Sequence, residues 1–410
     1  MSTAKFLRSA EEIGVRLCSD ALWSGDCCNW IGAAVEYKGS QWQVTRRLSG
    51  PDLYSGTSGI GLFLTYLFRC APEPDFRKTA EGAIRYALSQ LDRLSAADNF
   101  GFYSGLTGLA YVLAEMAEIF GGQNFAEQSL AVLRQLSDSH ANSGRWDVVT
   151  GSAGVIPVLL KLHDAYGDEF LFNLALQHGD MLLQSASRGG DGWSWSAREH
   201  QFRNNLVGFS HGTAGVAWSL LELHAKSAEE RFLTAAQEAF RYERHWYSPT
   251  WENWPDFRGS SEAGELSYVA GWCHGAPGIG LSRVRAFQLL GDQDCRTEAE
   301  IAVKTTTRVL KSALADGQGN YSLCHGHFGN AELLTYAGDV LADGESLQAV
   351  HQIAEDALQK YGTGKKAWPC GILNGEETPD LMLGLAGIGH FYLRLYDRLK
   401  ISSVLLVRPN

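Results

Sequence analysis

The chain alternates between strongly apolar segments and amphipathic segments along its whole length. Before each apolar segment lies a segment with one apolar and one charged face, such as residues 80–94 and 299–314. The apolar segments are hydrophobic around much of their circumference, as buried helices are, and occupy residues 59–70, 108–120, 154–166, 215–225, 278–290, 330–341 and 387–399. This pattern predicts seven inner and seven outer helices, with residues 10–22 as the outer partner of the first inner helix.

A G-x-x-G motif stands at the start of every apolar segment. Its first glycines, which number the units one to seven, are Gly56, Gly105, Gly151, Gly212, Gly275, Gly326 and Gly384. The intervals of 46 to 63 residues between them leave room for a helical hairpin and its loops. A fixed set of seven without an obvious polar cap favours an all-α fold, a closed α/α toroid in a single domain over residues 1–410. The alternative is an open superhelical solenoid.

In a closed toroid the seven motifs meet at one mouth, so residues far apart in sequence become neighbours. The residues directly before the first glycines are Ser55, Ser104, Thr150, His211, His274, His325 and Leu383. The residues one position earlier are Tyr54, Tyr103, Val149, Ser210, Cys273, Cys324 and Met382. Reactive side chains are therefore concentrated in units four, five and six.

Composition narrows the classes of function. The formal net charge is −11 and the basic residues form no run, so we expect no nucleic-acid partner. No stretch is long and apolar enough for a membrane span and the first residues lack the apolar core of a signal peptide, so we expect a cytoplasmic protein. The eight cysteines form no C-x-x-C pair, which favours buried, metal-bound or reactive thiols over disulfides.

The sequence Cys-His-Gly occurs in both unit five and unit six. Two cysteines with one histidine make a ligand set that suits Zn²⁺, and three protein ligands leave the fourth position open, as in catalytic zinc sites. An isolated cysteine is more often a small buried hydrophobe, but two at the same register of adjacent repeats favour a metal site. The spacing does not decide whether His274 or His325 completes the set with Cys273 and Cys324.

Several motifs together resemble the lanthionine synthetase C-like family, particularly the cyclase part of class II lanthipeptide synthetases. They are WCHG at 272–275, CHG at 324–326, SHGTAG at 210–215, WDVVTG at 146–151 and LMLGLAGIGHFYLRL at 381–395. The resemblance implies an α/α toroid and a zinc ion held by Cys273, Cys324 and His325. It also implies addition of a peptide cysteine thiol to dehydroalanine or dehydrobutyrine, closing a thioether ring.

The same resemblance implies roles for two further residues and for the partners. His211 matches the family's catalytic histidine and is expected to protonate the enolate, while Asp147 matches an acidic residue that orients a histidine or takes the thiol proton. Without the resemblance, Asp147 would be a turn or helix-cap residue and His211 an even choice between core and catalysis. The expected substrate is a dehydrated precursor peptide, supplied by a dehydratase domain or protein.

Three other functions remain open from the sequence. One is addition of glutathione or another free thiol to dehydroamino acids, which the eukaryotic branch of the family implies. Another is a non-catalytic peptide-binding protein with a structural zinc ion, which would need a fourth ligand such as His274. The last is a glycosidase, since such toroids also house enzymes with two carboxylates, here drawn from Asp147, Glu252 and Asp256.

Polar and aromatic insertions at 189–205 and 248–268 are candidates for holding a peptide.

Overall fold

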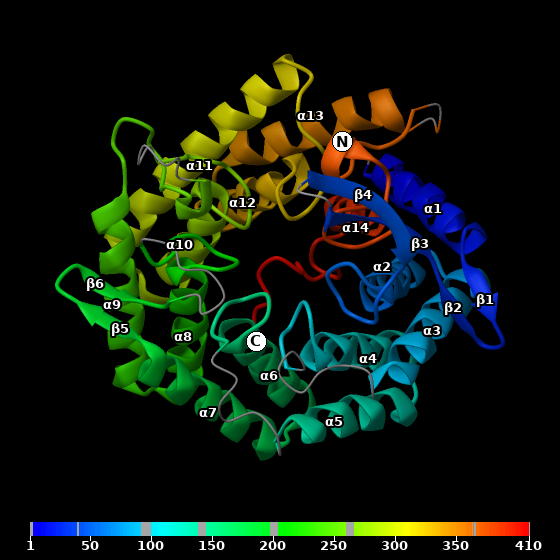
Figure 1. Cartoon of the computed structure of the whole chain (residues 1–410), viewed down its shortest axis with the longest axis horizontal. Helices are drawn as coiled ribbons and strands as arrows, with labels where there is room; N and C mark the ends of the chain where they lie inside the picture. The colour runs from blue at the N-terminus through cyan, green and yellow to red at the C-terminus, as the bar shows by residue number, and fades with distance from the viewer. Residues whose placement is uncertain are drawn as a thin grey trace.

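The computed structural model describes residues 3–38, 41–91, 100–137, 145–196, 204–259, 266–362, 364 and 366–409. In these residues fourteen α-helices form two concentric rings around a central axis (Figure 1). The inner helices are α2 (Thr57–Cys70), α4 (Leu106–Phe120), α6 (Ser152–Tyr166), α8 (Thr213–Ser227), α10 (Ala276–Leu290), α12 (His327–Val340) and α14 (Leu385–Tyr396). The outer helices are α1 (Ala4–Ser19), α3 (Pro74–Ser89), α5 (Gln123–Ser137), α7 (Glu169–Ser185), α9 (Glu230–Trp246), α11 (Gln293–Ala315) and α13 (Gly344–Tyr361). The predicted closed toroid is confirmed.

Each inner helix begins directly after the first glycine of a G-x-x-G motif, which is its N-cap. The second glycine of the motif lies in the first turn of the helix, where neighbouring units crowd together. At Gly59, a Cβ atom would lie 2.2 Å from the carbonyl oxygen of Leu53 and 2.7 Å from the Cβ of Leu381 in unit seven. Only a residue without a side chain fits this close approach.

The first outer helix does not have the predicted partner. Each inner helix from α2 to α12 packs mainly on the outer helix that follows it in sequence, whereas α1 packs mainly on α14. The expectation that residues 10–22 cover the first inner helix is therefore wrong. Because the last inner helix has no following outer helix, the start of the chain supplies one, and this contact joins the two ends of the chain and closes the ring.

A continuous chain of backbone hydrogen bonds links the seven turns around the mouth. At each junction an amide donates to the carbonyl of the next unit, with N···O distances of 2.9–3.3 Å. The donor and acceptor pairs are Tyr54 to Tyr103, Tyr103 to Val149, Val148 to Ser210, Ser210 to Cys273, Cys273 to Cys324, Cys324 to Met382, and Met382 back to Tyr54. The predicted register at the mouth is confirmed, with a shift of one residue on the donor side of unit three.

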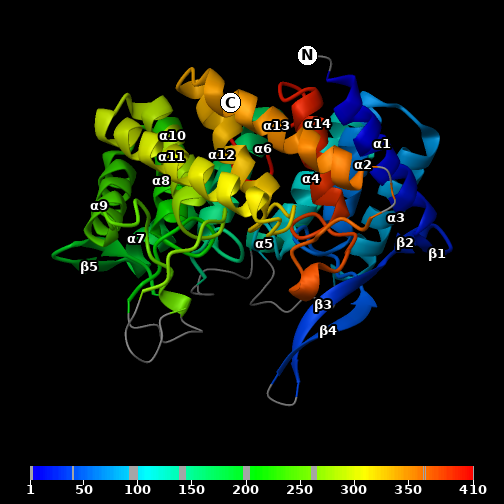
Figure 2. The same ribbon diagram turned by 90° about the horizontal axis from the view of Figure 1, so that it is seen from above.

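Among the described residues, three antiparallel hairpins lie outside the helical rings. The longest pairs β3 (Ile31–Lys38) with β4 (Gln41–Leu48) and projects from the side of the toroid that carries the mouth (Figure 2). The others pair β1 (Leu22–Ser24) with β2 (Cys27–Asn29), and β5 (Ser187–Gly189) with β6 (Gly192–Ser194). Hairpin β5–β6 lies at the first insertion, of which residues 197–203 are outside the described residues, as are residues 260–265 of the second.

The C-terminal segment fills the axis of the toroid. After α14 the chain turns inward, and Ile401 and residues 404–407 are buried at the centre of the rings (Figure 1). The phenol of Tyr103 donates to the carbonyl of Val404, and Trp272 Nε1 donates to the carbonyl of Leu405 at 3.0 Å. Trp272 directly precedes Cys273, so this segment supports the mouth from below. Among the described residues, no helix is both long and apolar enough to cross a membrane.

Candidate active site

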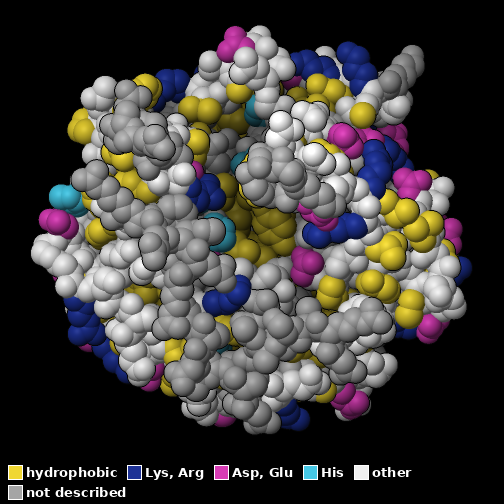
Figure 3. Space-filling model, viewed as in Figure 1, with side chains coloured by type: hydrophobic (Ala, Val, Ile, Leu, Met, Phe, Trp, Pro, Cys, Tyr) yellow, Lys and Arg dark blue, Asp and Glu magenta, His cyan; other side chains and the backbone are white. Residues whose placement is uncertain are grey.

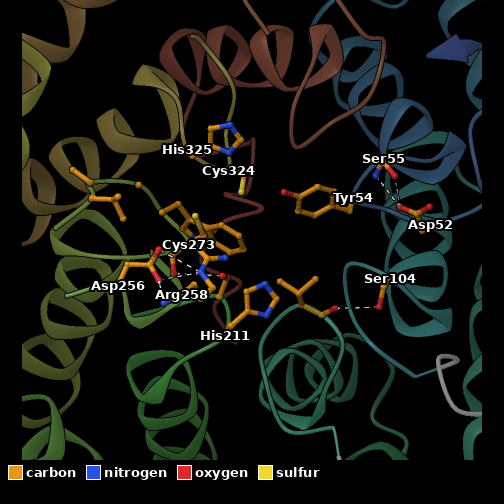
Figure 4. Close-up of a pocket in the computed structure, with 16 residues that line it drawn as sticks. Asp52, Tyr54, Ser55, Ser104, His211, Asp256, Arg258, Cys273, Cys324 and His325 are labelled. Atoms are coloured by element: carbon orange, nitrogen blue, oxygen red, sulfur yellow. Dashed lines mark hydrogen bonds and ion pairs between the residues drawn. The ribbon is translucent and has the colours of Figure 1, made fainter. Parts of the chain in front are cut away.

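The mouth of the toroid contains a cavity of about 710 Å³ (Figure 3). Hydrophobic side chains form its floor, and histidine and arginine side chains lie at its edge. Its walls come from the turns of six units and from the second insertion, and include Asp52, Tyr54, Ser55, Ser104, His211, Asp256, Arg258, Cys273, Cys324 and His325 (Figure 4). The residues that the sequence predicted at 211, 273, 324 and 325 therefore share one cavity.

The two cysteines of the Cys-His-Gly motifs are neighbours. The amide of Cys273 donates to the carbonyl of Cys324 at 3.3 Å, and the two side chains are hydrogen-bonded to each other. That hydrogen bond lowers the pKa of Cys273 to about 7 and, together with burial, raises the pKa of Cys324. The phenol of Tyr54 reaches across the cavity to Cys324 (Figure 4). The hydrogen bond between the two thiols therefore favours the thiolate form at Cys273.

The two histidines of these motifs have different surroundings. His325 lines the cavity, and the backbone carbonyl of Gly371 lies beside its ring. His274 has no exposed surface, and its ring lies 6.1 Å from that of His211, centre to centre. Its nitrogens make no hydrogen bond of ordinary geometry with a described residue, although the Val207 carbonyl lies beside the ring. Burial lowers the pKa of His274 to about 3, so the ring is neutral.

The backbone explains why the two histidines differ. Gly326 is extended, with φ of −104°, whereas Gly275 has φ of +83° and ψ of −163°, a conformation that favours glycine. In unit five the side chain of Asn253 accepts from the amide of Ala276 at 2.8 Å and donates to the carbonyl of Val269 at 3.0 Å. The second insertion therefore holds the unit-five turn in a form that the other units lack, and His274 is directed into the protein.

His211 and Asp147 form a hydrogen-bonded ion pair at the edge of the cavity. His211 Nδ1 donates to Asp147 Oδ2 at 2.7 Å, and 35% of the His211 side chain is exposed. Burial works against both charges, but the pair and the hydrogen bonds from Thr150 outweigh it, so the pKa of Asp147 is lowered and that of His211 is raised. The pair therefore favours the charged form of His211, whose side chain lines the cavity.

Asp147 also caps its own turn. Its Oδ1 accepts from the amide of Thr150 at 2.6 Å and from the Thr150 hydroxyl at 3.0 Å. Asp52 in unit one and Asp380 in unit seven stand at the same position before the glycine and cap their turns in the same way, at 2.7 and 2.8 Å. The two interpretations of Asp147 from the sequence, as a cap and as a partner of histidine, are thus both compatible with its contacts, one for each oxygen.

The positions of Cys273, Cys324 and His325 in the cavity bear on whether they could hold zinc. Within the described residues, no three His, Cys, Asp or Glu side chains are already gathered closely enough to hold a metal ion. The thiols of Cys273 and Cys324 are nevertheless in contact, and a Cβ atom at Gly271 would lie 3.6 Å from Cys273 Sγ and 3.3 Å from the Cβ of His325. The absent side chain of Gly271 leaves space between these two residues, so the donor set fits a zinc ion.

The carboxylates that a glycosidase would need are already paired. Asp147 binds His211, and Asp256 binds Arg258 through both oxygens. The Glu252 carboxylate lies outside the cavity lining and binds Lys304 at 2.7 Å and Arg308 at 2.6 Å. None of the three is a free acid or base facing another across the cavity, which argues against the glycosidase hypothesis.

The sequence missed two residues of the cavity. Arg258 comes from the second insertion and projects between Cys273 and His211, and Tyr54 faces Cys324 from unit one (Figure 4). Tyr54 could have been found, because it has the same register as the two cysteines. The sequence analysis named the insertion at 248–268 as a candidate for holding a peptide, but nothing in its sequence singles out Arg258 as the residue that enters the cavity.

The fold and the site define an α/α toroid with a cysteine- and histidine-lined mouth. A family model described as lanthionine synthetase C-like protein matches residues 48–406. The chain belongs to this family, as its motifs indicated.

Individual relatives agree with the family. The lacticin 481/lactococcin biosynthesis protein LcnDR2 of Lactococcus lactis subsp. lactis is 24% identical over 395 residues, 93% of this chain, and the match spans 40% of that relative's length. The glutathione S-transferase LANCL1 of Danio rerio is 23% identical over 350 residues, 82% of this chain and 80% of that protein.

Solved structures show the same architecture. Nisin cyclase superposes with a TM-score of 0.68 and 19% identity, covering 88% of this chain and 92% of that chain. A GH76 α-mannanase of Bacteroides thetaiotaomicron superposes with a TM-score of 0.52 and 10% identity, covering 98% of this chain and 97% of that chain. At these identities the structures show the fold alone, so the function has to be argued from the site.

Proposed function

We propose that this protein is a zinc-dependent lanthipeptide cyclase. It would add peptide cysteine thiols to dehydroalanine or dehydrobutyrine and so form lanthionine and methyllanthionine rings. Family membership and the lacticin relative support a cyclase of this class. The observation that carries the proposal is the convergence of Cys273, Cys324, His325 and His211 on one cavity.

The residues that would hold zinc are Cys273, Cys324 and His325. When bound there, zinc would supply a Lewis acid that lowers the pKa of the substrate thiol while the two cysteines keep the sulfur nucleophilic. The carbonyl of Gly371 lies beside the His325 ring and could accept from the nitrogen that does not bind zinc. The turn-to-turn hydrogen bond between Cys273 and Cys324 keeps both side chains on the same wall of the cavity.

The proton steps fall to His211 and Asp147. Attack of sulfur on the β-carbon produces an enolate, which needs a proton at the α-carbon. His211 lines the cavity, and Asp147 raises its pKa and so favours the protonated form that would give this proton. Asp147 is in turn fixed by Thr150, which keeps the imidazole in one orientation. The substrate would be a precursor peptide dehydrated beforehand by a separate domain or protein.

Addition of glutathione is the second candidate function, because one relative is a glutathione S-transferase. Both reactions would use the same thiol site and acceptor chemistry. They differ in whether the thiol belongs to the peptide that carries the dehydroamino acid.

One experiment separates these candidates. The purified protein is analysed for zinc and incubated with a dehydrated, cysteine-containing peptide, with and without glutathione. Cyclisation removes a free thiol at constant mass, whereas glutathione addition raises the mass of the peptide. A protein that binds zinc and peptide but consumes no thiol would be a non-catalytic binding protein, and the cyclase proposal would be wrong.

A further inference from the structure

Arg258 is the cationic side chain of the cavity. It lies in the short helix η2 (Phe257–Gly259), within the insertion between α9 and α10. Its guanidinium projects into the mouth between Cys273 and His211 (Figure 4). Of the described residues that line the cavity, Arg258 alone has a Lys or Arg side chain. A guanidinium, which stays charged at any pH at which the protein is folded, therefore faces the space where thiol and acceptor would meet.

The guanidinium is held from one side by Asp256. Arg258 Nε donates to both carboxylate oxygens at 3.0 and 3.3 Å, and Nη2 donates to Oδ2 at 2.8 Å. Asp256 is itself 6% exposed, and its amide donates to the carbonyl of Ser267 at 2.7 Å. The carboxylate is thus anchored to the insertion and fixes the plane of the guanidinium.

This pairing leaves the other edge of Arg258 available. The side-on contact uses Nε and Nη2, and Nη1 makes no hydrogen bond with a described residue. The Arg258 side chain is 40% exposed, and this exposed part faces the cavity. The geometry is that of a donor oriented in advance and directed at a position that the protein leaves empty.

We propose that Arg258 donates hydrogen bonds to the carbonyl oxygen of the dehydro residue and stabilises the enolate formed there. This inference rests on the proposed cyclase function. As the C–S bond forms at the β-carbon, the π electrons of the double bond move toward the carbonyl and place negative charge on its oxygen. The thiol proton passes to water, His211 gives its proton to the α-carbon and so restores the carbonyl, and water reprotonates His211, so that S–H is added across the double bond with no net change in protons. The reaction is an addition, so no oxidant, reductant or leaving group is involved.

Arg258 is then a catalytic residue and Asp256 is a positioning residue that acts through it. A hydrogen bond from a guanidinium strengthens as the neutral carbonyl becomes an enolate, so its effect falls mainly on kcat rather than on KM. A purely structural role, in which the pair only fastens the insertion, predicts changes in melting temperature and zinc content instead.

The test compares the variants Arg258→Gln, Arg258→Lys and Asp256→Asn with a matched control, Arg308→Gln. Arg308 also pairs with a carboxylate of this insertion, Glu252, but outside the cavity lining. Each protein is assayed for kcat and KM of ring formation, melting temperature and zinc content. We expect Arg258→Gln to lose about 10²–10³-fold in kcat, as removal of one oxyanion donor does. Arg258→Lys and Asp256→Asn should lose less, and Arg308→Gln should match the wild type.

Rescue with guanidinium ions separates the two roles. Millimolar guanidinium should restore part of the kcat of Arg258→Gln without changing its zinc content. The inference is overturned if Arg258→Gln keeps its kcat, or if its activity falls only together with zinc content and melting temperature and guanidinium restores nothing. Absence of ring formation by the wild type would instead refute the proposed function, and this inference with it.

Discussion

The Cys-His-Gly motifs of units five and six have the same three residues but different structures. The two cysteines have equivalent backbone positions, since each donates its amide to the next turn and lines the same cavity. The two histidines are not, because His325 lines the cavity while His274 is completely buried. The difference follows from the glycine after each histidine, which is extended at Gly326 and has positive φ at Gly275.

This difference shows that a motif fixes chemistry only together with its backbone. The ring of hydrogen bonds sets the position of each cysteine, and one residue later this restraint is released. In unit five, Asn253 from the insertion then determines where the chain goes. The same insertion carries Arg258 into the cavity. A local departure from the repeat thus removes one histidine from the mouth and adds one arginine.

The largest predicted effect contrasts the two histidines directly. His325→Gln should lose zinc and more than about 100-fold of its cyclisation activity, beyond what changes to outer-shell partners usually cost. His274→Gln should keep its zinc, since its ring does not line the cavity. Zinc per chain and the rate of ring formation are measured for both, with melting temperature as the control for folding. Loss of zinc from His274→Gln but not from His325→Gln would reverse the assignment.

The sequence was sufficient to predict features that repeat. Seven copies of the apolar pattern and of G-x-x-G predicted the toroid, and the register of these copies predicted that Cys273, Cys324 and His211 lie together at the mouth. Features that occur once were not predictable. The contact of α1 with α14 depends on ring closure. The path of the insertion that carries Arg258 depends on contacts such as the bridge from Asp256 to Ser267.

Hairpin β3–β4 is an intermediate case. Residues 31–38 and 41–48 are joined by Gly39 and Ser40, and β-branched and aromatic residues recur along both strands, which is a recognisable strand signal. The hairpin was not among the elements predicted from the helical repeat. The hairpin lies outside the two rings, so its omission did not alter the predicted fold or site.

The next prediction concerns the pH dependence conferred by Asp147. Asp147 raises the pKa of His211, so the protonated imidazole persists to higher pH. If His211 is the proton donor, activity falls as pH rises through that pKa. Asp147→Asn should therefore move the alkaline limb of the rate profile to lower pH and reduce activity near neutrality by about 10-fold or more, within the range of general acid catalysis.

Asp380→Asn is the matched control for this prediction. Asp380 caps the equivalent turn of unit seven and has no hydrogen bond or ion pair with a described histidine, and burial raises its pKa to about 6. Its replacement should leave the alkaline limb where it is. An identical shift in both variants, or none in Asp147→Asn, would show that the Asp147 carboxylate serves only as a cap.

The ion pair of Asp147 and His211 also makes the stability of the protein depend on pH. The pKa of Asp147 is lowered on folding, so its contribution is present above its unfolded pKa and is lost as the pH falls through the folded value. The pKa of His211 is raised, so its contribution is present below its unfolded pKa and is lost as the pH rises through the folded value. The stability difference between wild type and Asp147→Asn should therefore be largest between these limits, as measured by urea unfolding across pH.

The smallest predicted effect concerns the residues just before the two cysteines. Trp272 in unit five donates to the carbonyl of Leu405 in the C-terminal segment, whereas Leu323 in unit six has no polar group to contribute. Trp272→Phe keeps an aromatic ring near Tyr103 and Phe209 but leaves the Leu405 carbonyl without this partner. It should lower the free energy of unfolding by about 1–3 kcal/mol, the usual cost of an unsatisfied buried group.

Zinc content and ring formation should nevertheless change little in Trp272→Phe. The position of Cys273 is fixed by its own hydrogen bond to Cys324, which the substitution does not touch. Urea unfolding measures the stability, and zinc per chain with the cyclisation rate measures the site. If Trp272→Phe loses zinc while remaining folded, then the C-terminal segment, and not the ring of turns alone, holds unit five in register with unit six.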